Sequence, residues 1–231
     1  MPRDADSRPA GPRPGRGRVL VVGGGHFGQK AVAALGPRVL AVVEPQPSPE
    51  LRSLGAPIWP LEGLAGLRQA LASPRPPVWV APCLPRHLFA DWLRAELAPG
   101  DPRTLALDPA GLEDLPQVIA GPQGQLYLSL TDTLCPDNCP EPARICPKTG
   151  RPRGTPLHQR LAGLERPGFA NAVLVSHQMA PGLGAVAVGE MLAWRERLAQ
   201  RGGRWLVATA CRCHGVLEAL ELSPAREARD R

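Results

Sequence analysis

Short apolar runs rich in branched residues alternate along the chain with longer stretches in which apolar residues recur every three to four positions. The short runs predict strands, at residues 18–23, 38–44, 56–61, 76–82, 103–108, 125–130, 171–177 and 204–211. The periodic stretches predict helices, at residues 26–35, 62–72, 85–97, 183–198 and 213–221. Because strands that alternate with helices usually build parallel sheets, this order predicts an α/β fold with a doubly wound, mostly parallel, Rossmann-like sheet.

One stretch interrupts this alternation. Residues 131–156 contain six prolines and three cysteines and show the periodicity of neither a helix nor a strand. A loop of this length in a compact domain is usually functional or held by a ligand. We therefore expect a dinucleotide-binding domain at 18–125 and a C-terminal α/β part at 126–223 that carries the Cys/Pro-rich loop. Residues 1–17 and 224–231 are rich in arginine and poor in apolar residues, and we expect them to be disordered tails.

Charge and hydropathy limit the expected partners. The net charge is +6, but only two of the 27 basic residues are lysines and no basic patch is interleaved with aromatic residues. We attribute this bias to genome composition and expect no nucleic-acid partner. No apolar run reaches the roughly 18 residues that a membrane span needs, and arginine and proline occupy the place of a signal peptide's apolar region. We expect a cytoplasmic protein without membrane contact, and a homodimer or a protein partner stays open.

Three glycines lie between the first predicted strand and the first predicted helix, in VLVVGGGHFGQKAVAAL. In this position Gly23 permits a tight turn, Gly25 lets the backbone approach a pyrophosphate, and Gly28 allows close packing of helix on strand. The phosphates would lie at the helix N-terminus, where free N–H groups favour anions. Glu44 follows Gly23 by 21 positions and can accept hydrogen bonds from both ribose hydroxyls. It would repel a 2′-phosphate, so we expect NAD rather than NADP.

The glycine segment also resembles two known families. GGGHFGQKAVAAL followed by RVLAVVEP resembles the nucleotide-binding domain of the Trk/RCK potassium-transport regulators, over residues 18–85. GGG before a Gln-Lys pair, with LALDPAGLEDLPQVIAGPQGQLYLSLT later, is similar in layout to the precorrin-2 dehydrogenase domain of siroheme synthases. Both families lack the Cys-rich segment, so the resemblance implies dinucleotide binding through the glycines and Glu44 and transfers no substrate. His26 and Phe27 occupy variable positions of the motif, and we expect them only to line the loop.

Five of the six cysteines fall into two groups. Cys135, Cys139 and Cys146 lie in CPDNCPEPARIC, and Cys211 and Cys213 follow the last predicted strand. Clustered thiols in a cytoplasmic protein indicate a metal or a redox role, and zinc or an iron–sulfur cluster ordinarily takes four ligands. The fourth ligand could be Cys211 or Cys213, because that strand ends at the edge where the loop begins. The spacing matches no usual zinc or ferredoxin pattern, so a dithiol switch or inert thiols stay as alternatives.

Other candidates carry less weight. Asp108 and His177 fall at predicted strand ends, where catalytic groups are often placed. We nevertheless favour turn capping for Asp108 and a hydrogen-bonded loop imidazole for His177. Cys83 is expected in the core, and His87 and His158 on helix surfaces.

These features predict an NAD-linked oxidoreductase of unknown substrate. In this hypothesis the Cys-rich loop covers the nicotinamide, and a bound metal or cluster takes part in the redox step or shapes it. The sequence assigns no catalytic residue. One alternative is a non-catalytic nucleotide-sensing module of the Trk/RCK type, in which NAD or NADH changes how the protein meets a partner. Another is a zinc-clipped interaction domain with a vestigial nucleotide loop, since fold-level likeness does not specify chemistry.

Overall fold

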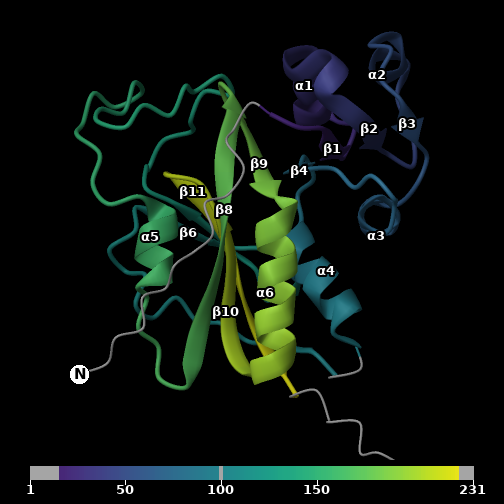
Figure 1. Ribbon diagram of the computed structural model, residues 1–231. Helices are drawn as coiled ribbons and strands as arrows, with labels where there is room; N and C mark the ends of the chain where they lie inside the picture. The colour runs from purple at the N-terminus through teal and green to yellow at the C-terminus, as the bar shows by residue number, and fades with distance from the viewer. Residues whose placement is uncertain (1–15, 99–100, 224–231) are drawn as a thin grey trace, which may run out of the picture.

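The first half of the chain alternates strands with helices, as its hydrophobic pattern predicts. The structure is a computed structural model that describes residues 16–98 and 101–223 (Figure 1). In the first half its elements are β1 (Val19–Val22), α1 (His26–Leu35), β2 (Val39–Val43), α2 (Pro49–Ser53), β3 (Ile58–Trp59), α3 (Gly63–Leu71), β4 (Trp79–Pro82) and α4 (Leu88–Glu96), with a 3-10 turn at Gly36–Arg38. The four strands pair in parallel in the order β3-β2-β1-β4.

Strand β1 lies in the middle of this parallel part and is buried on both faces. Leu20 and Val22 pack into one hydrophobic cluster with α3 and α4, and Val19 and Val21 pack into another with α1. A continuous apolar strand of this kind is typical of a parallel sheet that helices cover on both sides. The glycine turn that follows β1 is therefore held by a rigid, buried strand.

The second half is mostly antiparallel. Its elements are β5 (Arg103–Leu105), β6 (Gln117–Ala120), a 3-10 turn at Pro122–Gly124, β7 (Leu126–Ser129), α5 (Leu157–Ala162), β8 (Phe169–Ala180), β9 (Leu183–Ala187), α6 (Val188–Arg201), β10 (Gly203–Ala210) and β11 (His214–Leu222). Only Pro181 and Gly182 connect β8 to β9, and Gly182 has a φ of +71°. Connections this short allow antiparallel pairing, whereas parallel neighbours need a crossover of a dozen residues or more.

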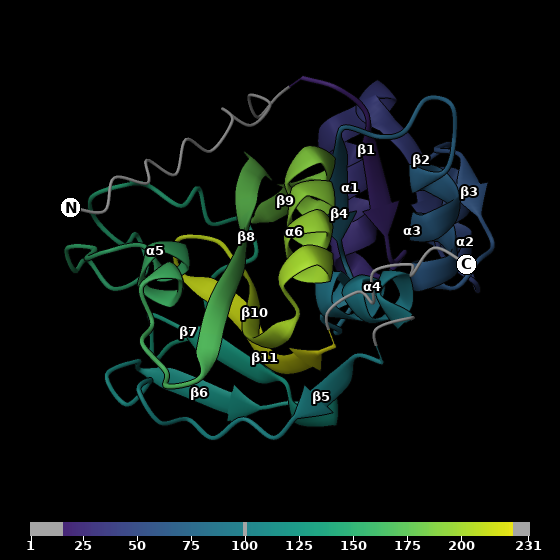
Figure 2. The same cartoon turned by 60° about the horizontal axis from the view of Figure 1, so that its bottom comes forward.

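Strand β9 joins the two halves because it pairs antiparallel with both β4 and β8. The result is one 11-stranded sheet in the order β3-β2-β1-β4-β9-β8-β10-β11-β7-β6, with β5 paired to β11 outside this path. Figure 1 shows the long strands β8, β10 and β11 running side by side, with α6 next to them. In Figure 2, α1, α2 and α3 gather around β1, β2 and β3, and α5 lies at the far end of the sheet.

The predicted fold class, a doubly wound and mostly parallel Rossmann-like sheet, is wrong. The sheet is mixed, most of its pairings are antiparallel, and the described residues contain six α-helices against 11 strands. The errors lie at 183–198, whose first five residues are strand β9, and at 213–221, which is strand β11 and not a helix. Leu217–Leu220 are buried without a break, so β11 lacks the alternation of period two that marks a half-exposed strand.

None of the described helices is both long and apolar enough to cross a bilayer.

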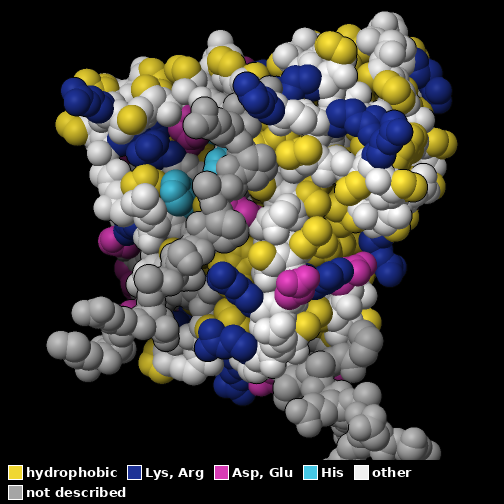
Figure 3. All heavy atoms as spheres, viewed as in Figure 1, with side chains coloured by type: hydrophobic (Ala, Val, Ile, Leu, Met, Phe, Trp, Pro, Cys, Tyr) yellow, Lys and Arg dark blue, Asp and Glu magenta, His cyan; other side chains and the backbone are white. Residues whose placement is uncertain are grey.

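On the face shown in Figure 3, the Lys and Arg side chains of the described residues lie in several separate groups, with hydrophobic side chains between them. This face therefore presents scattered positive charge and not one continuous basic surface.

Candidate functional site

The glycine turn after β1 has the steric properties that a phosphate loop requires. Gly23 has a φ of +104°, and a Cβ there would lie 2.4 Å from the carbonyl oxygen of Cys83. A Cβ on Gly28 would lie 2.0 Å from the carbonyl oxygen of Gly23. A Cβ on Gly25, by contrast, would meet nothing within 4 Å. Packing therefore requires glycine at Gly23 and Gly28, whereas Gly25 leaves open space beside the first turn of α1.

Glu44 follows β2 and lies against the glycine turn. Its Oε2 accepts a hydrogen bond of 2.8 Å from the backbone N–H of Gly24, and its Oε1 accepts one of 3.1 Å from the N–H of Gln46. Each carboxylate oxygen has two acceptor sites, so both can accept a further hydrogen bond. The structure thus brings the predicted ribose acceptor and the three predicted glycines together.

The Cys-rich segment docks on the first two turns of α1 through Asp137. One Asp137 oxygen lies 2.9 Å from Nε2 of His26, and the other lies 3.9 Å from Nζ of Lys30, which also donates to the Asp137 carbonyl oxygen. The hydrogen bond from His26 and the charge of Lys30 hold the pKa of Asp137 below its ordinary value. Phe27, beside His26, is 45% exposed. A carboxylate thus occupies the helix end where phosphates are expected.

Four cysteines surround the guanidinium of Arg153. Its Nη2 lies 4.0 Å from Sγ of Cys139, and its Nη1 contacts Sγ of Cys213. Burial would lower the pKa of Arg153, but Cys213, Cys146 and Cys139 raise it. Burial and the proximity of Cys139 and Cys146 raise the pKa of Cys135. The three loop cysteines and one cysteine of the β10–β11 turn therefore lie close together.

Cys211 lies outside this group. Burial and the nearby carboxylate of Glu141 raise its pKa to about 12, and its sulfur accepts weak hydrogen bonds of 3.4 Å from the N–H groups of Cys213 and His214. Cys213 contacts Arg153, whereas Cys211 has no contact with Arg153 among the described residues, although it lines one cavity together with Cys135, Cys139 and Cys213. Arg153 stands among these thiols, and among the described residues no group of three or more His, Cys, Asp or Glu side chains is arranged to hold a metal ion.

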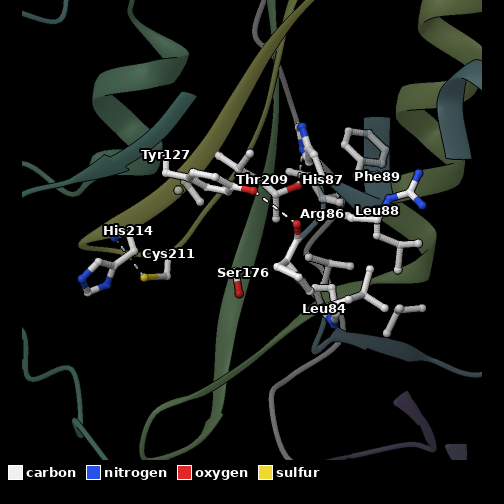
Figure 4. Close-up of a pocket in the computed structure, with 18 of the residues that line it drawn as sticks. Leu84, Arg86, His87, Leu88, Phe89, Tyr127, Ser176, Thr209, Cys211 and His214 are labelled. Carbon is white, nitrogen blue, oxygen red and sulfur yellow. Dashed lines mark hydrogen bonds between the residues drawn. The ribbon is translucent and has the colours of Figure 1, made fainter. Parts of the chain in front are cut away.

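A cavity of about 290 Å³ opens at the carboxyl end of β4, between the β4–α4 connection and strands β8, β10 and β11 (Figure 4). Its wall is mostly apolar, and the polar side chains that line it include Ser176, Thr209 and Tyr127. The lining also includes Leu84, Arg86, His87, Cys211 and His214.

A chain of hydrogen bonds leads from this cavity into the core. It consists of the Thr209 hydroxyl, the His87 imidazole and the Glu218 carboxylate, and is called the buried series below. Nε2 of His87 lies 3.1 Å from Oγ1 of Thr209, and Nδ1 lies 3.1 Å from Oε1 of Glu218. His87 is 1% exposed and Glu218 is fully buried. The second oxygen of Glu218 accepts a hydrogen bond of 2.6 Å from Arg94, which also pairs with Asp91. Figure 4 shows the Thr209 hydroxyl next to the His87 ring.

The prediction that His87 lies on a helix surface is wrong. His87 occupies the N-cap position of α4 and points into the core. His158 is half-buried in α5, and its Nδ1 lies 3.2 Å from the carbonyl oxygen of Cys211. Sequence reasoning missed the site at His87 because its two partners lie 122 and 131 residues away, and no local motif marks them.

The cavity adjoins both the glycine turn and the cysteines. Leu84 lines the cavity, and its Cδ2 would lie 3.3 Å from a Cβ on Gly23. A second cavity, of about 320 Å³, is lined by Phe27, by the Cys-rich segment and by Cys213. It shares three residues with the first, Ser176, Cys211 and His214. The glycine turn, the thiols and the buried series therefore lie around one connected region.

Three weaker candidates have structural roles. Asp108 is exposed, accepts a hydrogen bond of 2.9 Å from the N–H two residues on and pairs with Arg166, which is the capping role favoured by the sequence. The prediction of a hydrogen-bonded loop imidazole is wrong for His177, which lies in strand β8. Its ring packs edge-on against Trp79 at 5.4 Å between centroids, and its Nε2 has no hydrogen-bond partner among the described residues. Burial raises the pKa of Cys83 to about 12, as expected for a packed thiol.

Comparison with known proteins identifies relatives of this chain. Residues 89–223 match the family described as "Uncharacterized protein, C-terminal domain", a match that includes Thr209 and Glu218 and begins two residues after His87. An uncharacterized protein of Archaeoglobus fulgidus is 35% identical over 148 residues, which cover 63% of this chain and 66% of the relative. The match thus spans slightly less than two thirds of that relative's length, and no solved structure matches. Because the family match covers more than half of the chain, the protein belongs to the family described as "Uncharacterized protein, C-terminal domain".

Proposed function

We propose that this protein is an NAD(H)-binding oxidoreductase. The observation that carries the proposal is the glycine turn: Gly23 and Gly28 are fixed by packing, but Gly25 faces open space at the N-terminus of α1. That combination leaves room for a pyrophosphate against free backbone N–H groups, which the helix dipole also favours. Glu44 supplies the acceptor for an adenosine ribose beside the same turn.

The sheet order sets the direction in which a dinucleotide would lie. Glu44 follows β2, on one side of β1, and β4 lies on the other side. With its adenosine half at Glu44, the molecule would direct its nicotinamide half toward the end of β4 and the cavity beyond Leu84. When bound, NAD accepts or donates a hydride. The chain's own part is then to orient the substrate and to move a proton in that cavity.

Calorimetric titration with NADH tests this proposal. Gly25→Ala should abolish NADH binding while keeping the fold, because the added methyl group meets no protein atom and would occupy the phosphate's space. Gly189→Ala is the matched control, since a Cβ there also meets nothing within 4 Å and lies in α6. Equal NADH affinity in both variants, or no binding by the wild-type protein, would contradict the proposal.

Glu44→Gln tests the preference for NADH over NADPH. The amide keeps the shape of the side chain but loses the charge that strengthens ribose hydrogen bonds and repels a 2′-phosphate. We expect NADH affinity to fall by about tenfold and the ratio of NADH to NADPH affinity to move toward one. An unchanged ratio would show that Glu44 does not face the ribose. Binding of NADH without turnover of any small acceptor would favour the nucleotide-sensing alternative.

A second function, thiolate metal binding, is favoured by one observation. Four cysteine thiols from two distant segments lie near Arg153: those of Cys135, Cys139, Cys146 and Cys213. Four is the usual number of ligands for zinc or an iron–sulfur cluster. Support for this proposal comes from the donor set and not from a closed coordination geometry.

Anaerobic purification followed by an absorbance spectrum and elemental analysis separates the metal states. Visible absorbance would identify an iron–sulfur cluster, and one equivalent of zinc without absorbance would identify a zinc site. Cys139→Ala should abolish the metal, and Cys83→Ala, whose thiol lies outside the group, should retain it. A wild-type protein with neither metal would leave the dithiol alternative.

A further inference from the structure

We infer that the cavity at the end of β4 holds a small neutral alcohol or ketone, and that Thr209, backed by His87 and Glu218, exchanges the substrate's hydroxyl proton. The inference rests on the proposed function, because NAD⁺ is the oxidant. Its own basis is the buried series of hydrogen bonds, which the dinucleotide motif does not require.

The geometry is that of a hydroxyl activated by a base that a third group orients. Both distances from the His87 ring, to Thr209 and to Glu218, are 3.1 Å, within the range over which a proton passes directly. Thr209 is half-buried and lines the cavity, whereas Glu218 is fully buried behind the ring. A ligand in the cavity can therefore reach the threonine hydroxyl, and the carboxylate is protected from solvent.

The charge of Glu218 determines which nitrogen of His87 carries the proton. Burial alone would raise the pKa of Glu218, but hydrogen bonds from His87 and Arg94 hold it below its ordinary value, so it is a carboxylate. A carboxylate only accepts hydrogen bonds, so Nδ1 of His87 must donate to it. In the neutral imidazole Nε2 then carries the lone pair, and the Thr209 hydroxyl donates to it. The ring is therefore fixed in the tautomer that can take a proton from the cavity side.

The cavity favours a small neutral substrate. Its wall is mainly leucine, valine, methionine and phenylalanine side chains, and 290 Å³ is near the lower end of the size of ligand pockets. Among the described residues its lining contains one arginine, Arg86, and no lysine, and Arg86 pairs with Asp91 at 2.9 Å. The one guanidinium charge at the cavity is therefore already compensated by a carboxylate, which disfavours an anionic substrate. A secondary alcohol places its hydroxyl at Thr209 and its hydrocarbon against the wall.

The step balances as follows. With NAD⁺ bound, the carbinol carbon would lose its hydrogen with both bonding electrons to the cofactor, and a carbon–oxygen double bond would form as the O–H bond breaks. The hydroxyl proton passes to Oγ1 of Thr209, whose own proton passes to Nε2 of His87. The alcohol is oxidised to a ketone, NAD⁺ is reduced to NADH, and the proton rests on an imidazolium that Glu218 stabilises. Ketone reduction reverses each transfer.

The test uses the full-length protein with NAD⁺ and cyclohexanol, 1-phenylethanol or 2-octanol, and follows NADH absorbance. Thr209→Val keeps the side-chain shape and should lower kcat by about 100-fold while the Kd for NADH is unchanged. Thr155→Val is the matched control, because Thr155 is exposed and lies outside both the cavity lining and the hydrogen bonds of His87. It should leave both kcat and the Kd unchanged.

Glu218→Gln tests the positioning role with a readout other than activity. The glutamine oxygen can accept from Arg94 only if its amide group donates to Nδ1 of His87, which moves the ring proton to Nε2. Nitrogen NMR of the imidazole should show this change of tautomer. The Kd for NADH should stay unchanged while kcat falls, a split that general loss of structure would not produce. The variant should also lose about 100-fold in kcat, as the wrong tautomer cannot take the proton.

The outcomes separate this inference from the proposed function. If the wild-type protein does not bind NADH, the proposed function fails and the inference fails with it. If NADH binds but none of the three alcohols or their ketones reacts, the inference alone is overturned. Equal kcat in Thr209→Val and Thr155→Val also overturns it. Covalent labelling of Thr209 by a fluorophosphonate would do so as well, because it would show a nucleophile for acyl transfer in place of a proton carrier.

Discussion

Substituting Gly28 by alanine tests the packing of α1 on β1. The added Cβ would lie 2.0 Å from the carbonyl oxygen of Gly23 and 2.9 Å from its carbonyl carbon, and both are backbone atoms that cannot rotate away. Side-chain carbons essentially never approach within 3.0 Å, so the start of α1 must move from the turn by at least about 1 Å. Overpacking of this kind costs about 1–3 kcal/mol. For a chain of this size each kcal/mol lowers Tm by about 2–4 °C, so we expect a fall of about 2–12 °C.

Thermal unfolding of the ligand-free protein, followed by calorimetry, measures this effect. Gly25→Ala is the comparison, because its Cβ meets nothing within 4 Å. It should cost at most about 1 kcal/mol, since alanine is a poorer helix N-cap than glycine. Both variants should lose NADH binding, although only Gly28→Ala loses much stability. Wild-type Tm in Gly28→Ala, or an equal fall in Gly25→Ala, would refute the steric account of the turn.

Three further changes test other parts of the site. Glu218→Gln removes the buried carboxylate partner of Arg94, so chemical denaturation at pH 7 should show unfolding free energy lower by about 3–5 kcal/mol. The pKa of Glu218 is lowered in the folded state, so the difference in unfolding free energy between wild type and variant is fully present above about pH 4.3. It shrinks as the pH falls through the folded pKa. A difference that stays constant in strong acid would contradict this account. Asp137→Asn removes a carboxylate from beside Lys30 and the start of α1. Calorimetry should show NADH affinity about threefold higher at low salt, and a smaller increase at high salt. Weaker NADH binding would contradict competition between Asp137 and the phosphates. The pKa of Cys83 near 12 predicts no modification by iodoacetamide at pH 8 until urea unfolds the chain, and mass spectrometry that finds native labelling would disprove its burial.

The glycine turn was predictable because its determinants are local. Strand, turn, helix and Glu44 lie within 27 residues, and each position has one steric or electrostatic requirement. The second half was not predictable in the same way. Strands β9 and β11 are buried on both faces over most of their length, so their hydrophobic pattern does not distinguish a strand from a helix. The parallel order inferred for the whole sheet followed from those two errors.

The thiols and the buried series show a second limit of sequence reasoning. The spacing of the cysteines identified the segment, but only the structure shows that Cys213 contacts Arg153 and that the Cys211 sulfur accepts the N–H of Cys213. For His87 the partners come from β10 and β11, more than 120 residues away. The register of that hairpin pairs Val207 with Glu218 and Thr209 with Val216. Glu218 therefore lies on the same face of the sheet as Thr209, and both side chains can reach the His87 ring.

Two of the attachments of the Cys-rich segment lie close to the glycine turn and to the β8–β9 turn. The carbonyl oxygen of Cys139 accepts hydrogen bonds of 2.8 Å from the N–H of Gly182 and from the side chain of Gln178, which fixes the segment to the β8–β9 turn. Two residues earlier, Asp137 fixes it to α1 through His26 and Lys30. The segment therefore bridges the strand that joins the two halves and the helix that carries the glycine turn.

If the protein binds NADH and a metal as proposed, this attachment predicts that the two ligands influence each other. A pyrophosphate at the start of α1 would compete with Asp137 for His26 and Lys30, and Asp137 is only two residues from Cys139 in the group around Arg153. Any change that binding makes at Asp137 is thus passed along a short, fixed piece of backbone to the thiols. Coupling between two binding equilibria is reciprocal. The factor by which NADH changes metal affinity at the cysteines must therefore equal the factor by which the metal changes NADH affinity, and a factor of one would mean that the two sites share a region without communicating.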